Sequence, residues 1–548
     1  MIMSRYVIGI DYGTLSGRCV LVDVNSGEEI AESVLNYAHA VMDETLPNGE
    51  KLPSSFALQH PEDYLDVLRT TVPDVLSKAG VGAEDIIGLG IDFTACTVLP
   101  MDEKGTPLCM KDEFKDNKHS YVKLWKHHAA QPEADEINEL AAKRGEPWLP
   151  IYGGKVSCEW ALPKILETLR KAPEVYDNTY RFIEAADWLS LMLTGEETHS
   201  APFAGYKGLW NAETGYPSND FMTALDPRLD GIVGTKLSEK VLGMDKKAGY
   251  INESGAALTG LNIGTPVSLP MIDAHAAMPA LNITDDGDLM LIVGTSSCHI
   301  LNSKEVKSVE GICGYVKDGV VPGLYTYEAG QAGVGDIFDW FVKNCVPAGY
   351  AEEAREKGIS IHKLLREKAS KLSVGESGLL ALDWWNGNRS VLVNSNLTGM
   401  ILGMTLGTKP EEIYRALIEA TAFGLKVIVE QYENSGISIN SICAAGGIAQ
   451  KDEMMMQIYA DVLDREIRIA GSTQAGALGS AIYASVAAGA YADLKAAAEK
   501  LSKPDAKTYA PIAENAMAYK RLYGEYKTLH DYFGKENKVM ERLNEFKS

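Results

Sequence analysis

Two apolar, strand-like runs near the start of the chain flank a short turn rich in glycine and hydroxyl side chains. The runs span residues 7–10 and 19–24, and this pattern predicts a β-hairpin. Gly13 and Gly17 would let a ligand approach the backbone, because they carry no Cβ and adopt positive φ at low cost. N–H groups and hydroxyls in such a turn, including Thr14, can converge on an anion. Taken alone, the stretch favours a plain surface hairpin over a nucleotide site.

Asp11 ends the first run and would direct a carboxylate at the same turn. A carboxylate beside a phosphate requires a cation such as Mg²⁺ between them. Residues 289–300 then repeat the pattern, with a strand, a Gly294-Thr295 turn and a second strand. Two such hairpins suggest an internal duplication. The second copy lacks the acidic residue, so we expect the two turns to share phosphate contacts but not the metal.

The chain is too long for one hydrophobic core. With 548 residues, two large domains are expected, and a polar loop at 284–288 separates the two hairpin-bearing halves. We therefore predict domains at 1–284 and 285–548, with a final helix after Pro504 packing on the second. Residues 411–432 are predicted to form an amphipathic helix, and residues 476–481 a helix of small residues that lets neighbouring elements approach closely.

Several other residues have both a structural and a functional interpretation. The apolar strand 86–93 ends in a loop of small residues, 94–97, and ligands bind at the carboxyl ends of strands in open α/β sheets. A tight turn explains that loop equally well. Asp273 stands where an extended segment meets an Ala-rich helix. It can be interpreted as the N-cap of that helix or as a general base. Lys207 lies among aromatics and glycines, where a snorkelling surface lysine is the favoured interpretation.

Two neighbouring histidines, His127 and His128, stand in a charged, helix-like region, and we predict that both are solvated surface residues. The surrounding segment, 118–193, is predicted to be mainly helical.

Charge and cysteine usage exclude some classes of partner. A formal net charge of −23 argues against nucleic acid and against an anionic membrane surface, although a local glycine-rich turn can still bind an anion. The eight cysteines include no CxxC pair, no run is apolar and long enough to span a bilayer, and the start lacks a secretion-signal pattern. These features predict a cytoplasmic protein.

The chain contains neither a GxxxxGK[ST] loop nor a GxGxxG fingerprint. Three glycine turns instead follow three separate strands, at Gly13-Thr14, Gly294-Thr295 and Gly446-Gly447, which predicts a nucleotide held between two domains. In these motifs the chain resembles the FGGY carbohydrate kinases of the actin-like ATPase superfamily. The resemblance covers nearly the whole chain. The resemblance implies an α/β, ribonuclease H-like fold with two duplicated domains and an inter-domain cleft. Within the family, residues 9–18 are similar to the bacterial ribulokinase form.

The resemblance also implies roles for individual residues, transferred position by position. Gln450-Lys451-Asp452 departs from the Asn or Ser of many relatives, which leaves the adenine contact open. Asp273 would be the catalytic base, and Asp11 would bind Mg²⁺ directly or through water. The implied sugar-binding residues are Ala95, Lys207, Asp273 and Glu328, and the implied nucleotide-binding residues are Gly13, Thr14, Gly294, Thr295, Gly335, Gly446 and Gly447.

The activity implied by the resemblance is phosphoryl transfer from ATP, with Mg²⁺, to ribulose in arabinose catabolism. The N-terminal domain would bind the sugar and the C-terminal domain the nucleotide. Two alternatives stay open: a kinase of the same fold acting on xylulose, glycerol or a pentitol, and a non-metabolic actin-like ATPase. A homodimer is the family's expectation, and the handedness of the sugar is not determined by the sequence.

Overall fold

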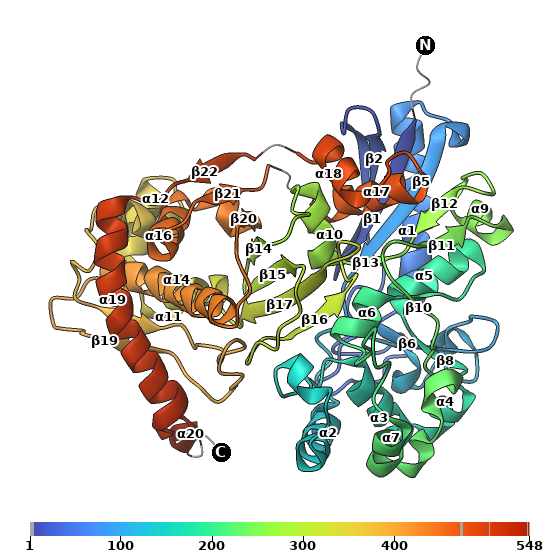
Figure 1. The fold of residues 1–548 in the computed structure, drawn as a ribbon, viewed down its shortest axis with the longest axis horizontal. Coiled ribbons are helices and arrows are strands. Elements are labelled where there is room, and N and C mark those ends of the chain that lie inside the picture. The colour runs from blue at the N-terminus through green and yellow to red at the C-terminus, as the bar shows by residue number, and fades with distance from the viewer. Residues whose placement is uncertain (1–4, 472–474, 504, 545, 547–548) are drawn as a thin grey trace. The chain divides into compact units, whose positions relative to one another are not determined.

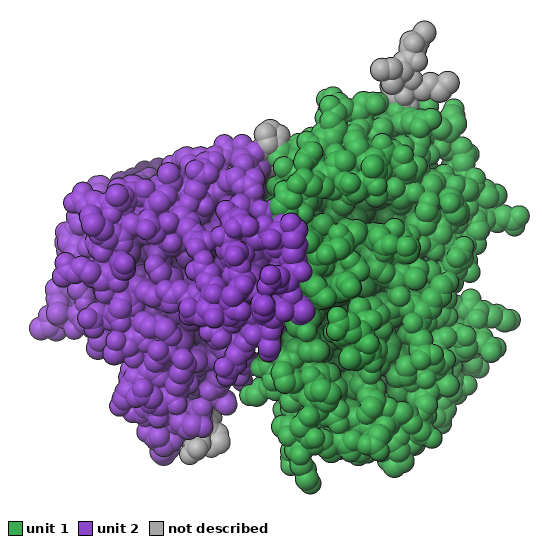
Figure 2. Space-filling model, in the orientation of Figure 1, with its two compact units in different colours: residues 1–285, 315–326, 474–503 green, residues 286–314, 327–473, 504–548 purple. Residues whose placement is uncertain are grey.

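A computed structural model of the chain describes residues 5–471, 475–503, 505–544 and 546. The chain forms two compact units (Figure 2). Unit 1 comprises residues 1–285, 315–326 and 474–503, and unit 2 comprises residues 286–314, 327–473 and 504–548. Residues 315–326 and 474–503, from the second half of the chain, therefore belong to unit 1. The predicted division at 284/285 places them in the second domain instead.

The sheet of unit 1 is built on the predicted hairpin. β1 pairs antiparallel with β2 and parallel with β5, so the hairpin and the central strand are both confirmed. A further short strand, β13 (Met271–Ile272), pairs parallel with β5. The sheet runs in the order β11 (Lys247–Tyr250), β12 (Pro266–Ser268), β5 (Ile86–Phe93), β1 (Tyr6–Tyr12), β2 (Ser16–Asp23), β3 (Glu29–Asn36).

The sheet of unit 2 repeats this order. β14 pairs antiparallel with β15 and parallel with β20, as β1 does with β2 and β5. The outer strands correspond too, because β20 pairs parallel with β21, which pairs antiparallel with β22. The predicted duplication is therefore present in the topology. The order is β17 (Tyr325–Gln331), β15 (Ser297–Ser303), β14 (Asp288–Val293), β20 (Ser441–Ala445), β21 (Ile467–Ile469), β22 (Lys507–Tyr509).

Two helices cover opposite faces of the unit 1 sheet. α17 (Ala475–Ala487) packs on β1 and β5, as Figure 1 shows, and also against α10 (Asp273–Ala280). It approaches so closely that a Cβ on Gly9 would collide with the main-chain oxygen of Ala477. α1 (Pro61–Ala79) covers the other face, where Tyr12 donates to the Tyr64 carbonyl and a Cβ on Gly17 would collide with Val67. The small residues of α17 thus permit the close approach that the sequence predicts.

A smaller sheet with its own helices is inserted into unit 1. An apolar cluster containing Trp160 lies among these elements. Segment 118–193 is less uniformly helical than predicted, because two strands lie within it. The inserted strands and helices are β4 (Leu58–Gln59), β6 (Val98–Met101), β7 (Val122–Lys123), β8 (Arg181–Glu184), α2 (Gln131–Arg144), α3 (Ala161–Lys171), α4 (Pro173–Asn178), α6 (Ala201–Tyr206) and α7 (Asn219–Leu225). Helix α5 (Ala185–Thr194) packs instead on β5, β11 and β12 of the main sheet.

A long buried helix, α14 (Pro410–Asn434), organises the helices of unit 2 and confirms the amphipathic helix predicted there. Arg415 and Tyr519 both donate to the Glu419 carboxylate at 2.8 Å, which ties α14 to the C-terminal helix. The tail packs on unit 2 as expected. The helices around α14 are α11 (Gly335–Cys345), α13 (Ile361–Ala369), α16 (Glu453–Leu463) and α19 (Ala513–Asp531). Within the described ranges, every helix is too short or too polar to cross a bilayer.

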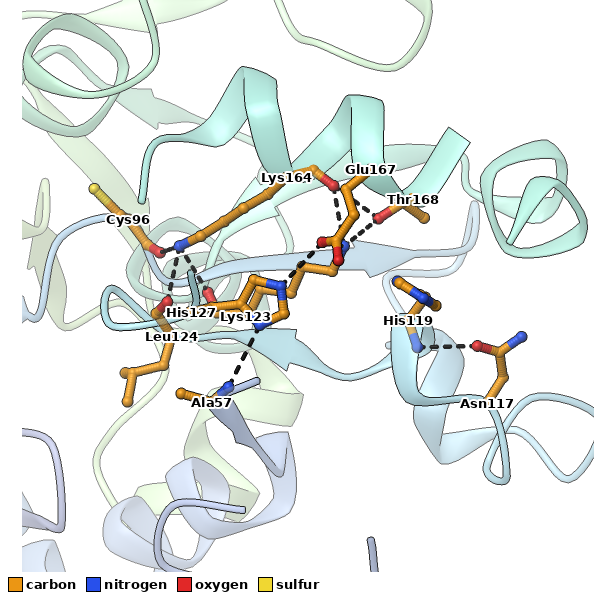
Figure 3. Close-up of polar contacts among 10 residues, drawn as sticks. All are labelled: Ala57, Cys96, Asn117, His119, Lys123, Leu124, His127, Lys164, Glu167 and Thr168. Carbon is orange, nitrogen blue, oxygen red and sulfur yellow. Dashed lines mark hydrogen bonds and ion pairs between the residues drawn. The ribbon is translucent and has the colours of Figure 1, made fainter. Parts of the chain in front are cut away.

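The prediction that His127 is a solvated surface residue is wrong. Its ring is completely buried, with Nε2 2.9 Å from the Glu167 carboxylate and Nδ1 accepting from the Ala57 N–H at 3.4 Å (Figure 3). Of the charged residues close to it in the sequence, Lys123 is buried as well and pairs with the same Glu167 carboxylate at 2.6 Å. His128 is exposed, as predicted.

Burial gives His127 a measurable effect on stability. Desolvation lowers its pKa from 6.5 to about 4. Between these values the unfolded chain binds a proton that the folded chain does not, so the free energy of unfolding falls as the pH falls through this window. Between pH 7 and pH 5, we expect the free energy of unfolding to fall by about 2 kcal/mol less in His127→Gln than in the wild type. Urea titrations at both pH values measure this difference.

His128→Gln is the matched control for that experiment. A hydrogen bond from the His128 ring to the Glu159 carboxylate raises the pKa of His128, so removal of His128 cannot reduce the acid sensitivity. Equal acid sensitivity in the wild type and His127→Gln would contradict the assignment.

The close approach of α17 predicts an unusually damaging substitution. A Cβ on Gly479 would overlap the main-chain oxygen of Ala276 in α10, and neither backbone can move freely. We expect Gly479→Ala to destabilise the protein by about 3 kcal/mol or more. Gly524→Ala is the control, because an added Cβ in the middle of α19 meets open space, and it should stabilise by about 0.5–1 kcal/mol. Thermal denaturation of both variants tests this, and similar midpoints would refute it.

Candidate active site

Three carboxylates gather at the carboxyl ends of strands in unit 1. Asp11 on β1 lies opposite Asp92 on β5 in the parallel register. Ile272 of β13 lies opposite Phe93, so Asp273 follows directly at the same edge of the sheet. Asp92 is fully buried, whereas Asp11 and Asp273 are partly exposed. In α/β sheets this edge is where ligands bind.

Asp11 and Asp92 are close enough that the charge on one carboxyl group disfavours ionisation of the other. Burial raises the pKa of both Asp11 and Asp92, and the charge of Asp11 raises that of Asp92 further. Ser480 of α17 donates to Asp92 Oδ2 at 2.6 Å, while no described residue donates a hydrogen bond to Oδ1. A hydrogen bond between two carboxyl groups exists only when one is protonated. The pair therefore requires either a proton or a nearby cation.

Helix α17 leaves space beside this pair. A Cβ on Gly476 would lie 3.3 Å from Asp92 Oδ1 and 3.4 Å from Asp11 Oδ2, so the start of the helix faces both carboxylates. The positive end of a helix dipole favours negative charge there. Asp92 is a residue that we did not predict to be functional. Its signal in the sequence is a single acidic residue in an otherwise apolar strand.

The turn at Gly13 and Thr14 is held from several sides. Gly13 N donates to Ser16 O at 3.0 Å and Tyr37 donates to Gly13 O at 2.9 Å. Thr14 Oγ1 accepts from the Trp125 indole at 3.2 Å, which leaves the Thr14 hydroxyl hydrogen to be donated to a ligand.

Gly17 has a different role from the one expected. Its φ is not positive, and an added Cβ would collide with Val67 of α1. It is a packing glycine rather than part of a ligand cradle.

Asp273 is the first residue of α10, and its Oδ1 accepts the Ala274 N–H at 2.7 Å. The predicted N-cap position is therefore off by one residue, because Ile272 is the N-cap and Asp273 is the first helical residue. Because the side chain is also partly exposed at the carboxylate edge, this does not exclude a role as a base.

The sugar-side residues of unit 1 border one apolar cluster. Ala95, in the loop after β5, packs against the cluster that includes Cys96, Trp160 and Leu209. Lys207 ends α6, and its ammonium lies over the Trp160 ring, 5.6 Å from the centroid. Trp160 is thus a second residue absent from the predicted site. An aromatic just before a helix gives no signal in the sequence that separates it from a core residue.

In unit 2 the predicted glycine turns come together. Gly335 N donates to Gly294 O at 3.0 Å, and a Cβ on Gly335 would lie 2.8 Å from Ile448. Gly446 has a φ of +98° and packs on the end of β14, while an added Cβ on Gly447 meets nothing within 4 Å. These glycines therefore border a common region at the ends of β14 and β20.

The remaining predicted residues of unit 2 are placed as follows. Thr295 O accepts from Val334 N at 2.8 Å, beside the same turns. Glu328 lies on β17 and is largely buried. Asp452 accepts from Met455 N at the start of α16 and pairs with Arg366 at 3.1 Å. Asp452 therefore has a structural role.

The structure places half of the predicted site in each unit. Unit 1 holds Asp11, Gly13, Thr14, Ala95, Lys207 and Asp273, and unit 2 holds Gly294, Thr295, Glu328, Gly335, Gly446 and Gly447. Among the residues described, no three His, Cys, Asp or Glu side chains are arranged to bind a metal ion. Mg²⁺ binds through one or two carboxylates, with water and phosphate as its other ligands, and the Asp11–Asp92 pair fits that requirement.

Residues 6–279 match the N-terminal domain, and residues 289–488 the C-terminal domain, of the FGGY family of carbohydrate kinases. The chain belongs to that family, as its motifs predict. A protein named ribulokinase from Halalkalibacterium halodurans is 52% identical, covering 100% of this chain and 98% of its own. A ribulokinase from Bacillus licheniformis is also 52% identical, covering 97% and 98%.

The fold prediction is confirmed by a solved structure. Xylulose kinase from Rhodospirillum rubrum superposes with a TM-score of 0.81 at 24% identity, covering 96% of this chain and 99% of that one. The predicted α/β, actin-like architecture with two duplicated sheets is therefore correct.

Proposed function

We propose that this chain phosphorylates ribulose, transferring the terminal phosphoryl group of ATP to a sugar hydroxyl. The observation that carries the proposal is 52% identity over the full chain to proteins named ribulokinase. The likeness to xylulose kinase, at 24% identity, supports the fold and does not select the sugar.

We assign the general base to Asp273. Phosphoryl transfer depends mainly on positioning and electrostatic stabilisation, with one carboxylate accepting the proton of the attacking hydroxyl. Asp92 is fully buried and accepts a hydrogen bond from Ser480, so it is not available to a sugar. Asp11 faces the phosphate turn on the same strand edge. Asp273 is partly exposed and held by its own helix, as a base requires.

The phosphates are assigned to the two hairpin turns. The hydroxyls of Thr14 and Thr295 are donors suited to phosphate oxygens. Gly13 and Gly294, whose own N–H groups donate to the Ser16 and Ser296 carbonyls, would let those oxygens approach the backbone. Asp11, with Asp92 behind it, would hold Mg²⁺ directly or through water, and that ion neutralises charge on the phosphates. We assign Gly335, Gly446 and Gly447 to the rest of the nucleotide.

The sugar is assigned to Ala95, Lys207 and Glu328. Lys207 would donate to sugar hydroxyls, Glu328 would accept from them, and Ala95 would limit the space at one end. Sites that hydrogen-bond a hydroxyl reject analogues lacking it, because a buried polar group is then left unmatched. The L form of ribulose, a place in arabinose catabolism, a cytoplasmic location and a homodimer stay predictions.

The proposal is tested by measuring ADP release with MgATP across ribulose and xylulose of both hands, pentitols and glycerol, with a no-sugar control. We expect the strongest stimulation from ribulose. Stimulation by xylulose or glycerol alone would support sugar kinase activity but contradict the assignment of ribulose as the substrate. Turnover that is indifferent to every sugar would favour a non-metabolic ATPase.

The base assignment predicts a selective loss of rate in Asp273→Asn. Asparagine still accepts the Ala274 N–H but cannot take a proton, so kcat should fall by about 100-fold or more with little change in thermal midpoint. Asp493→Asn is the control, because Asp493 also accepts a main-chain N–H at a helix start in unit 1 and should tolerate the change. Sugar-dependent turnover that survives in Asp273→Asn would rule the assignment out.

A further inference from the structure

One peptide group beside the proposed sugar site is held at both ends by buried charged side chains. Lys164 Nζ donates to the carbonyl of Cys96 at 2.6 Å (Figure 3). The N–H of Thr97, on the same peptide, donates to Glu184 Oε2 at 2.8 Å. The negative end of the peptide dipole thus faces an ammonium and its positive end faces a carboxylate. This peptide joins Cys96, the residue after Ala95, to Thr97.

Both charged residues come from elements outside the loop. Lys164 lies on α3 and Glu184 ends β8, and both are almost completely buried. Lys164 also donates to the main-chain oxygens of Leu124, at 2.8 Å, and Lys123, at 3.3 Å. Desolvation lowers the pKa of Lys164 and raises that of Glu184 to about 7. Burying two such groups is costly, so positioning explains their presence here better than stability does.

The loop itself has a conformation that needs support. Cys96 has a φ of +58°, a left-handed conformation that is strained for a residue with a Cβ. The loop is closed by Thr97 Oγ1, which donates to Thr94 O at 3.0 Å. Because the Cys96–Thr97 peptide is fixed at both ends, the backbone of Cys96 cannot rotate to an ordinary conformation. The direction of Ala95 is set by the same restraint.

A neighbouring lysine provides an internal comparison. Lys123 is as deeply buried as Lys164, but it donates to Glu167 at 2.6 Å, Thr168 at 2.7 Å and the carbonyl of Lys164 at 3.0 Å (Figure 3). None of these bonds reaches residues 94–97. Lys123 therefore shares the burial and the network of Lys164 without holding the loop.

We propose that Lys164 and Glu184 are positioning residues that clamp the Cys96–Thr97 peptide and thereby fix Ala95 for sugar binding. This inference rests on the proposed function, because that function assigns Ala95 to the sugar. Neither residue touches substrate in this scheme, and the nucleotide turns are not affected by them.

Lys164→Met tests the clamp, with Lys123→Met as the matched control. Loss of a charge-assisted hydrogen bond to the loop should raise the KM for ribulose roughly tenfold or more, while the KM for ATP stays within about twofold. The Thr97 amide should exchange hydrogen roughly tenfold faster than in the wild type. Lys123→Met should leave the KM for ribulose and the exchange of Thr97 near wild-type values. A KM for ribulose within about twofold of wild type in Lys164→Met would overturn the proposal.

A second variant covers the case in which Lys164→Met does not fold. Glu184→Leu removes the oxygen that accepts the Thr97 N–H, so it should also raise the KM for ribulose, whereas an unchanged KM overturns the clamp. If the wild-type chain phosphorylates no ribulose, the proposed function fails. The exchange of Thr97 then decides the clamp alone: faster exchange in the variant supports it, and unchanged exchange overturns it.

Discussion

The contact on which unit 1 depends is the direct packing of α17 on β1 and β5, with almost no side chain between the backbones. Gly9 and Gly90 allow it from the strands and Gly479 allows it against α10, since a Cβ at any of these positions would collide with a main-chain oxygen. The same contact brings Ser480 to Asp92 and Gly476 beside Asp11. Packing and chemistry are therefore not separable at this edge of the sheet: the residues that permit the approach also shape the space around the carboxylates.

Buried polar groups determine the rest of unit 1 in a different way. The inserted elements carry two lysines, a histidine and a glutamate that are all buried, and their polar groups bond to one another, to the Thr168 hydroxyl or to the main chain. Such networks contribute little net stability, because desolvation offsets the attraction between charges. What they provide is a unique arrangement of the loops that they join, here including the loop at residues 94–97.

Much of the fold and part of the site could be predicted from the sequence, and the division follows the range of the interactions. The hairpins at Gly13 and Gly294 and helix α14 depend on local periodicity and turn residues, and they were predicted correctly. The return of residues 315–326 and 474–503 to unit 1 depends on contacts far apart in the chain, which no local pattern contains. Asp92, Trp160 and the burial of His127 were missed for the same reason, because the local sequence around a charged or aromatic residue does not show whether it lies in a buried network or on the surface.

The return of α17 also has a consequence for how the chain can be made. The face of β1 and β5 that carries Gly9, Gly88 and Gly90 has no covering helix until residue 487 has left the ribosome, because α17 ends there. The first 285 residues therefore emerge with one side of their sheet open to water and cannot complete their core as they are synthesised. Unit 1 is the first to be synthesised, but it can complete its fold only late in translation. Until then, its apolar strands depend on rapid completion of the chain, or on chaperones, to avoid aggregation.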